Sequence, residues 1–109
     1  MSTPGEVEGR AAIFAALGDA TRLALVATLV AGSPRSISQL AQGSHLTRQA
    51  ISKHLRVLEG VGIVRSVRVG RESRFELRPE PLNDVKAYLA RVSEQWDEAL
   101  SRLRSLVEE

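Results

Sequence analysis

Hydrophobic residues recur every three or four positions over most of the chain, which is the spacing of one face of an α-helix. Two such segments open the sequence, at residues 6–17 and 20–31, with Gly18 and Asp19 between them. A glycine commonly ends a helix, and an aspartate caps the next one because its side chain accepts a hydrogen bond from a free backbone N–H. We therefore expect two consecutive helices. The expected buried stripe of the second helix consists of Leu23, Val26, Leu29 and Val30.

Two further helices follow, each with a clear start signal. Ser36 and Gln39 match the capping box, in which each side chain accepts a hydrogen bond from the other residue's backbone, and Gly43 ends this short helix. Thr47 then caps a fourth helix over residues 48–59. Only a few residues separate the two helices, so a tight turn must join them.

The hydrophobic period changes from about 3.6 to two between residues 63 and 77, which predicts a β-hairpin. One parity carries the apolar residues Val67, Val69, Phe75 and Leu77. Pairing Val69 with Ser73 keeps these residues on one face, so we expect a three-residue tip at positions 70–72. A two-residue loop would instead mix apolar and charged residues on each face.

The last helix is predicted over residues 82–107, after Pro79 and Pro81. Its apolar residues are spaced by three or four throughout, close to the heptad spacing of a coiled-coil seam. The seam consists of Leu82, Val85, Leu89, Val92, Trp96, Leu100, Leu103 and Val107. Left exposed, it would form a sizeable apolar patch. We therefore predict that the seam residues from Leu82 to Leu103 join two copies in a homodimer; the alternative is packing within one subunit.

Composition limits the class of protein. The length of 109 residues corresponds to one domain, and the absence of cysteine excludes disulfides, thiolate metal sites and thiol catalysis. The acidic start of the chain does not read as a signal peptide. Its longest uncharged run, Leu23–Pro34, is too short to span a bilayer. We expect a single domain, residues 1–109, that is soluble, cytoplasmic and not bound to a membrane.

Charge is unevenly distributed along the chain. Residues 35–75 contain eight Lys/Arg and two Asp/Glu, whereas the remaining residues contain seven Lys/Arg and eleven Asp/Glu. A basic centre between acidic ends suggests that the middle of the chain meets a polyanion. The alternative is a random scatter of charge on a solvated surface.

The order of the predicted elements is that of a winged helix-turn-helix, a mainly α fold with a small β-hairpin and, here, a long C-terminal dimerisation helix. Residues 36–59 would form the helix-turn-helix and residues 63–77 the wing. In such a motif the second helix lies in the major groove of DNA. Ile51, Leu55 and Leu58 would hold that helix to the core, and the opposite face has no carboxylate. The predicted contacts to double-stranded DNA on this helix are Thr47, Arg48, Gln49, Ser52, Lys53, His54 and Arg56.

The hairpin adds a second predicted DNA contact. Arg71 lies at its tip, where it could reach phosphate or a narrow minor groove, and we place Arg68 and Arg74 together on the outer face. An alternative is a winged-helix module that binds another protein and no DNA, but the acid-free outer face of the fourth helix counts against it. An enzyme is not expected, because Ser52 and His54 point about 160° apart on a helix and cannot form a dyad.

Several segments resemble the ArsR family of bacterial repressors. Residues 16–23, Ala-Leu-Gly-Asp-Ala-Thr-Arg-Leu, look like its opening signature, and residues 47–58 resemble its recognition helix. The segment 60–64 and the Gly-Arg pair at 70–71 are also similar to the family pattern. The resemblance covers residues 7–77. It implies a homodimer joined by the first and last helices, with Val7 and Phe14 in the interface, and a palindromic operator.

The chain departs from the metal-sensing branch of that family. Metal-sensing members carry cysteines in the short helix before the turn, where this chain has Ile-Ser-Gln-Leu-Ala at 37–41. Other members place Asp and His ligands along the last helix, which has no histidine here. The only histidines are His45, in the turn, and His54, in the recognition helix. We therefore expect no metal and no cofactor, and the sequence identifies no effector.

Overall fold

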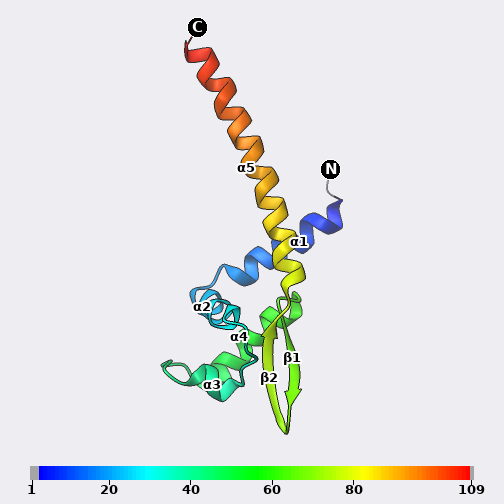
Figure 1. The fold of residues 1–109 in the computed structure, drawn as a ribbon, viewed down its shortest axis with the longest axis vertical. Helices are drawn as coiled ribbons and strands as arrows, with labels where there is room; N and C mark the ends of the chain where they lie inside the picture. The colour runs from blue at the N-terminus through cyan, green and yellow to red at the C-terminus, as the bar shows by residue number, and fades with distance from the viewer. Residues whose placement is uncertain (1–2, 109) are drawn as a thin grey trace.

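The computed structural model describes residues 3–108, so residues 1, 2 and 109 of the predicted domain lie outside the described residues. Five helices and a two-stranded antiparallel sheet follow one another in the predicted order (Figure 1). They are α1 (Pro4–Leu17), α2 (Ala20–Val30), α3 (Ile37–Ala41), α4 (Arg48–Gly60), β1 (Val64–Val69), β2 (Glu72–Leu77) and α5 (Pro79–Glu108). The predicted fold class is confirmed.

Local hydrogen bonds explain where three of the helices begin. Asp19, Ser36 and Thr47 each accept a hydrogen bond from the backbone N–H three residues on, at 3.0–3.1 Å. The Oε1 atom of Gln39 accepts a hydrogen bond from the N–H of Ser36 at 2.9 Å, which completes the capping box. All three predicted caps are therefore confirmed, and a Ser or Thr cap stabilises a helix by about 1 kcal/mol.

The core lies between α1, α2, α3, α4 and the base of the hairpin. Ile51, Leu55 and Leu58 of α4 are almost completely buried, as predicted. The prediction for α2 was partly wrong, because Leu23 and Val30 are exposed. Its buried residues are Leu25, Val26 and Leu29. The helix is apolar on nearly every side, so hydrophobic spacing alone did not identify the side that meets α1 and α4.

Within residues 3–108, no single helix is long and apolar enough to cross a membrane. Only α1 and α2 taken together reach the required length and composition, and the two are bent by 94° at the break between them.

The hairpin has a two-residue tip, so the predicted three-residue tip is wrong. Val69 pairs with Glu72, and Val67 pairs with Arg74. Gly70 has a φ of 66°, whereas no non-glycine residue in the described chain has a positive φ. A turn with positive φ at its first central residue matches the right-handed twist of two paired strands, and glycine supplies that conformation without steric cost.

This register changes which side chains share a face of the hairpin. Residues directly opposite one another in a sheet lie on the same face, so Leu77 shares a face with Val64 and Phe75 with Ser66. That face meets the core at the base of the hairpin. Arg68 lies on this same face and Arg74 on the other one, so their predicted common outer face is wrong. Both strands are exposed near the tip, at residues 68–73, so burial does not enforce the alternation there.

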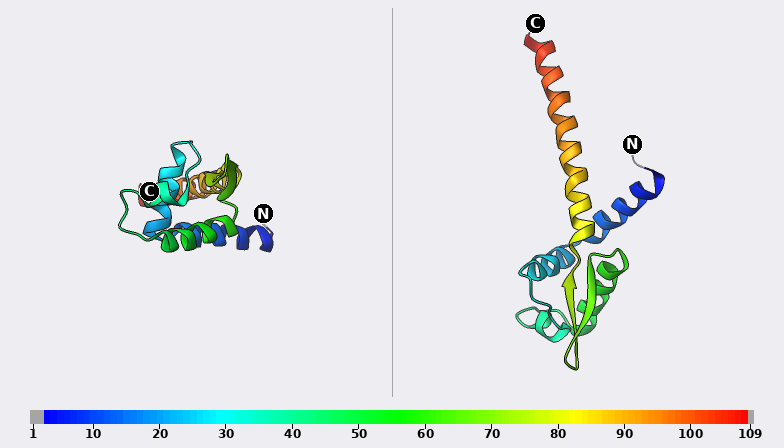
Figure 2. Two further views of the ribbon diagram at one scale, coloured as in Figure 1. Left: turned by 90° about the horizontal axis from the view of Figure 1, so that it is seen from below. Right: turned by 45° about the vertical axis from the view of Figure 1, so that its right-hand side comes forward.

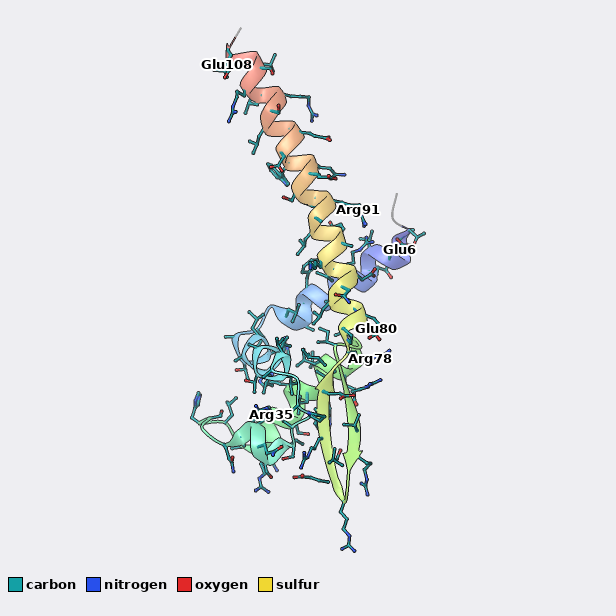
Figure 3. All side chains as sticks on the ribbon, in the orientation of Figure 1. Glu6, Arg35, Arg78, Glu80, Arg91 and Glu108 are labelled. Atoms are coloured by element: carbon teal, nitrogen blue, oxygen red, sulfur yellow. The ribbon has the colours of Figure 1, made fainter. Side chains whose placement is uncertain are left out.

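A third segment pairs with the hairpin, which the sequence analysis did not predict. The N–H of Arg35 donates to the carbonyl of Phe75 at 2.9 Å, and the N–H of Phe75 donates to the carbonyl of Arg35 at 2.7 Å. Arg35 comes just before Ser36, the N-cap of α3, and lies between that helix and the hairpin (Figure 3). The wing is thereby fastened to the helix-turn-helix by main-chain hydrogen bonds.

Helix α5 gives the molecule its elongated shape, 67 × 30 × 21 Å. It begins three residues earlier than predicted and includes both prolines, because the first turn of a helix has no intrahelical partners for its N–H groups. Val85 is buried against the core, but the helix then projects away from the body (Figures 1 and 2). Trp96 and Leu103 are 64% and 58% exposed. Beyond Val85 the seam is therefore largely exposed in its own subunit, and Val92 is partly buried.

Candidate nucleic-acid interface

The outer face of α4 brings together most of the predicted DNA contacts. Gln49, Lys53 and Arg56 are exposed, and Ser52 lies partly buried beside them. A shallow groove of about 420 Å³ runs along this face, lined by Thr47, Gln49, Ala50, Ser52, Lys53 and Arg56. No carboxylate lines it. Amide, hydroxyl and cationic groups on one helix face are the groups that bond base edges and phosphates.

The elements around α4 hold this face in place. Leu40 of α3 is buried against the inner side of α4, and the turn between the two helices is ordered by local hydrogen bonds. Gly43 has a φ of 75°, and the Oγ atom of Ser44 accepts a hydrogen bond from the N–H of Leu46 at 3.1 Å. The free part of α5 projects from the end of the body opposite α3 and the hairpin tip (Figures 1 and 2). The candidate site thus rests on packed helices, not on a mobile loop.

The wing arginines differ in their surroundings. The guanidinium of Arg74 forms an ion pair with Glu72 at 2.9 Å, and that of Arg65 with Glu76 at 2.8 Å. Within residues 3–108, Arg68 and Arg71 form no ion pair, and both are exposed. Of the three wing residues predicted to contact DNA, Arg68 and Arg71 therefore keep their full charge available. Arg74 has a neighbouring carboxylate that offsets its charge.

A polar cluster that was not predicted from the sequence lies behind α4 and is formed by Asp19, Arg22 and His54. Arg22 donates from Nε to the carbonyl of Ala16 at 2.5 Å and from Nη2 to that of Ala15 at 3.4 Å. Its Nη1 atom lies 3.4 Å from Nδ1 of His54, and Oδ2 of Asp19 lies 3.8 Å from that same nitrogen. The backbone N–H of Arg22 lowers the pKa of Asp19 by bonding its carboxylate. Residues 32 positions apart meet here, so no local signal in the sequence indicated the contact.

His54 consequently differs from the other predicted DNA contacts. Its side chain is partly buried and faces the start of α2, whereas Ser52 lines the outer groove. A DNA contact by His54 stays a prediction. His45 is exposed in the turn. Within residues 3–108, no group of three or more His, Cys, Asp or Glu side chains is arranged to hold a metal ion.

The predicted dimer interface is partly exposed and partly built into the subunit. Phe14 and Val7 are exposed on α1, and Phe14 packs at a tilt against Tyr88 of α5, with ring centroids 6.4 Å apart. Val85 is buried in its own subunit, and Leu82 packs partly on the same core, so a role for these two residues in the interface stays a prediction. The exposed members of the predicted interface are Val7, Phe14, Leu89, Trp96, Leu100 and Leu103.

Comparison with known proteins gives consistent matches. Residues 17–67 match the family model described as a helix-turn-helix domain. The chain is 38% identical over 80 residues to the uncharacterized HTH-type transcriptional regulator YuzN of Bacillus subtilis strain 168, covering 68% of this chain and 87% of that protein. It is similar in structure to an ArsR-like transcriptional regulator from Rhodococcus sp. RHA1, with a TM-score of 0.84, 38% identity and coverage of 98% and 97% of the two chains. A winged helix-turn-helix domain from Mycobacterium bovis, described as homodimeric, shares the fold with a TM-score of 0.65, 22% identity and coverage of 85% of each chain.

Proposed function

This chain belongs to the ArsR family of winged helix-turn-helix transcriptional regulators, and we propose that it acts as a homodimeric repressor that reads a palindromic DNA operator. The observation that carries the proposal is the outer face of α4. That helix is capped, packed on its inner side and free of carboxylates along the groove that faces outward.

The two basic parts of the site have different tasks. Gln49 can bond adenine through a bidentate pair, and Lys53 can reach guanine or phosphate, so α4 reads bases from the major groove. The N-terminus of α4 attracts a phosphate through its free N–H groups. Arg68 and Arg71 have no carboxylate partner among residues 3–108, and they neutralise backbone phosphates or enter a narrow minor groove.

The homodimer accounts for the uncovered part of α5. Trp96 and the two leucines that follow it on the seam are more than half exposed in the subunit. A second copy of the same face would bury this patch, and the similar Mycobacterium bovis domain is described as homodimeric. A two-fold axis presents one copy of α4 to each of two inverted half-sites, about 34–36 Å apart along DNA.

Selection of bound duplexes from random DNA tests the proposed operator. We expect enrichment of two inverted half-sites whose centres are about 10–10.5 base pairs apart, or a multiple of that spacing. The selection is repeated with a variant carrying Gln49→Ala and Lys53→Ala as the matched control, in which enrichment should be lost. Enrichment of a single asymmetric site, or of no site at all, contradicts a palindromic operator.

Operator binding is also expected to need no metal ion. The chain has no cysteine, and within residues 3–108 no cluster of possible ligands is in place. Affinity measured by fluorescence anisotropy should be the same with a chelator and with added zinc, copper or cadmium. Magnesium at matched ionic strength is the control, since it screens phosphates without seeking nitrogen ligands. A tenfold shift with a stoichiometric transition metal would reveal a site that includes His45, His54 or carboxylates.

A further inference from the structure

One arginine joins three helices behind the candidate DNA-binding face. Arg22 stands in the first turn of α2, and its guanidinium reaches back to the last turn of α1 and across to α4. Two of its nitrogens donate to the carbonyls of Ala15 and Ala16, and a third lies 3.4 Å from Nδ1 of His54. Oδ2 of Asp19 lies 3.8 Å from the same nitrogen. Asp19 and Arg22 together therefore link the end of α1 to the middle of α4.

The chemistry of these groups is well matched. A guanidinium is planar, carries five donors in a fixed fork and is never an acceptor. The last carbonyls of α1 carry the negative end of that helix. That of Ala15 also accepts the N–H of Gly18 at 3.2 Å, so Arg22 is its second donor. Because Arg22 can only donate, a hydrogen bond from it to His54 uses the lone pair of Nδ1, and Oδ2 of Asp19 lies 3.8 Å from the same nitrogen. A lysine ammonium has the charge but not the spread to reach both helices.

The position of His54 on α4 makes this contact relevant to DNA reading. Gln49 and Arg56 lie about 140–160° around the helix from His54, on the outer face. A contact on the inner side therefore sets the rotation of α4 about its own axis. At a side-chain radius of roughly 5–6 Å, a rotation of about 10° moves Gln49 by about 1 Å. Such a displacement disrupts a bidentate hydrogen bond.

We propose that Arg22 is a positioning residue that sets the orientation of the recognition helix relative to the dimer. This inference rests on the proposed function. It concerns the orientation of α4 in the dimer, not whether α4 binds DNA. Helix α1 carries Val7 and Phe14, the exposed residues assigned to the subunit interface. The interface fixes the position of α1, and Arg22 fixes α4 relative to α1. The separation of the two recognition helices in the dimer is therefore set in part by Arg22, although Arg22 does not itself contact DNA.

The test compares the selected two-half-site operator with a duplex of equal length that retains one half-site. Arg22→Lys keeps the positive charge and removes the planar guanidinium with its five donors. We expect it to bind the full operator at least tenfold more weakly and the single half-site less than threefold more weakly. The salt dependence of binding should not change, because no phosphate contact is lost. Inserting one base pair between the half-sites should cost the variant less than it costs the wild type.

A second variant, Arg22→Gln, keeps the proposal testable if Arg22→Lys does not fold. Its planar amide can still donate hydrogen bonds but is too short to reach both α1 and α4, so it should lose at least tenfold on the full operator and less than threefold on the single half-site. Equal losses on both duplexes, or a salt slope lowered by a unit per subunit, overturn the positioning role. A wild-type protein that does not prefer the operator to a scrambled duplex overturns the proposed function itself, a result visible before any variant is measured.

Discussion

Replacing Trp96 with alanine is expected to weaken dimerisation by about 2–4 kcal/mol, which is roughly a 30- to 1000-fold increase in the dimer Kd. The side chain is 64% exposed in the subunit and lies near the middle of the uncovered α5 seam. Burial of a tryptophan removes a large apolar area from water, and a two-fold interface loses two copies of it at once. Sedimentation equilibrium across a range of protein concentrations measures the change.

The matched control for this substitution is Gln95→Ala, one residue away on the same helix. Gln95 is exposed and lies off the apolar seam, so its loss should leave the dimer Kd unchanged. The subunit fold of both variants should be intact, because Trp96 is largely exposed in its own subunit. The unfolding midpoint, measured on the same samples, checks this. A monomeric mass for the wild type at micromolar concentration, or equal effects of the two substitutions, contradicts the α5 interface.

Gln49→Ala is expected to cost about 1–3 kcal/mol on the true operator and much less on scrambled DNA, because it removes a contact to a base edge. Arg71→Ala should weaken both duplexes to a similar degree and lower the salt slope by about one unit per wing, because each neutralised phosphate releases counterions. Arg56, further along α4, should behave like Arg71. Salt titrations of binding on the two duplexes separate these effects.

Arg65→Ala is the matched control on the hairpin. Arg65 carries the same charge as Arg71 but is paired with Glu76 at 2.8 Å, so its removal should change the salt slope less. A Gln49→Ala variant that loses affinity equally on both duplexes shows that Gln49 reads no base. An Arg71→Ala variant that changes neither affinity shows that the wing does not touch DNA.

The parts of the fold that depend on local chemistry were predictable from the sequence. The capping box of Ser36 and Gln39 lies within four residues, and both of its hydrogen bonds are present. The Thr47 cap and the buried face of α4 follow in the same way, because a single amphipathic helix with polar flanks has only one side to bury. The resulting order of elements was sufficient to identify the fold class.

The parts that depend on distant contacts were not predictable. Alternation of side chains in the hairpin is informative only where one face is buried, and here only the base around Val64 is buried. The strand register is therefore set by the turn, in which Gly70 and Arg71 form a two-residue tip. The Arg22–His54 contact joins residues 32 positions apart, and the bridge between Arg35 and Phe75 joins segments on either side of α4. Neither contact has a periodic pattern that would reveal it.

The most direct test of the account is the affinity of the wild-type protein for its selected operator and for a scrambled duplex of the same length and composition, measured from about 50 to 200 mM salt. We predict that log affinity falls linearly with log salt on both duplexes, and that the operator is preferred by a factor of about 10³ or more at the upper end of this range. Equal affinity for the two duplexes at every salt concentration would contradict a sequence-specific DNA-binding regulator.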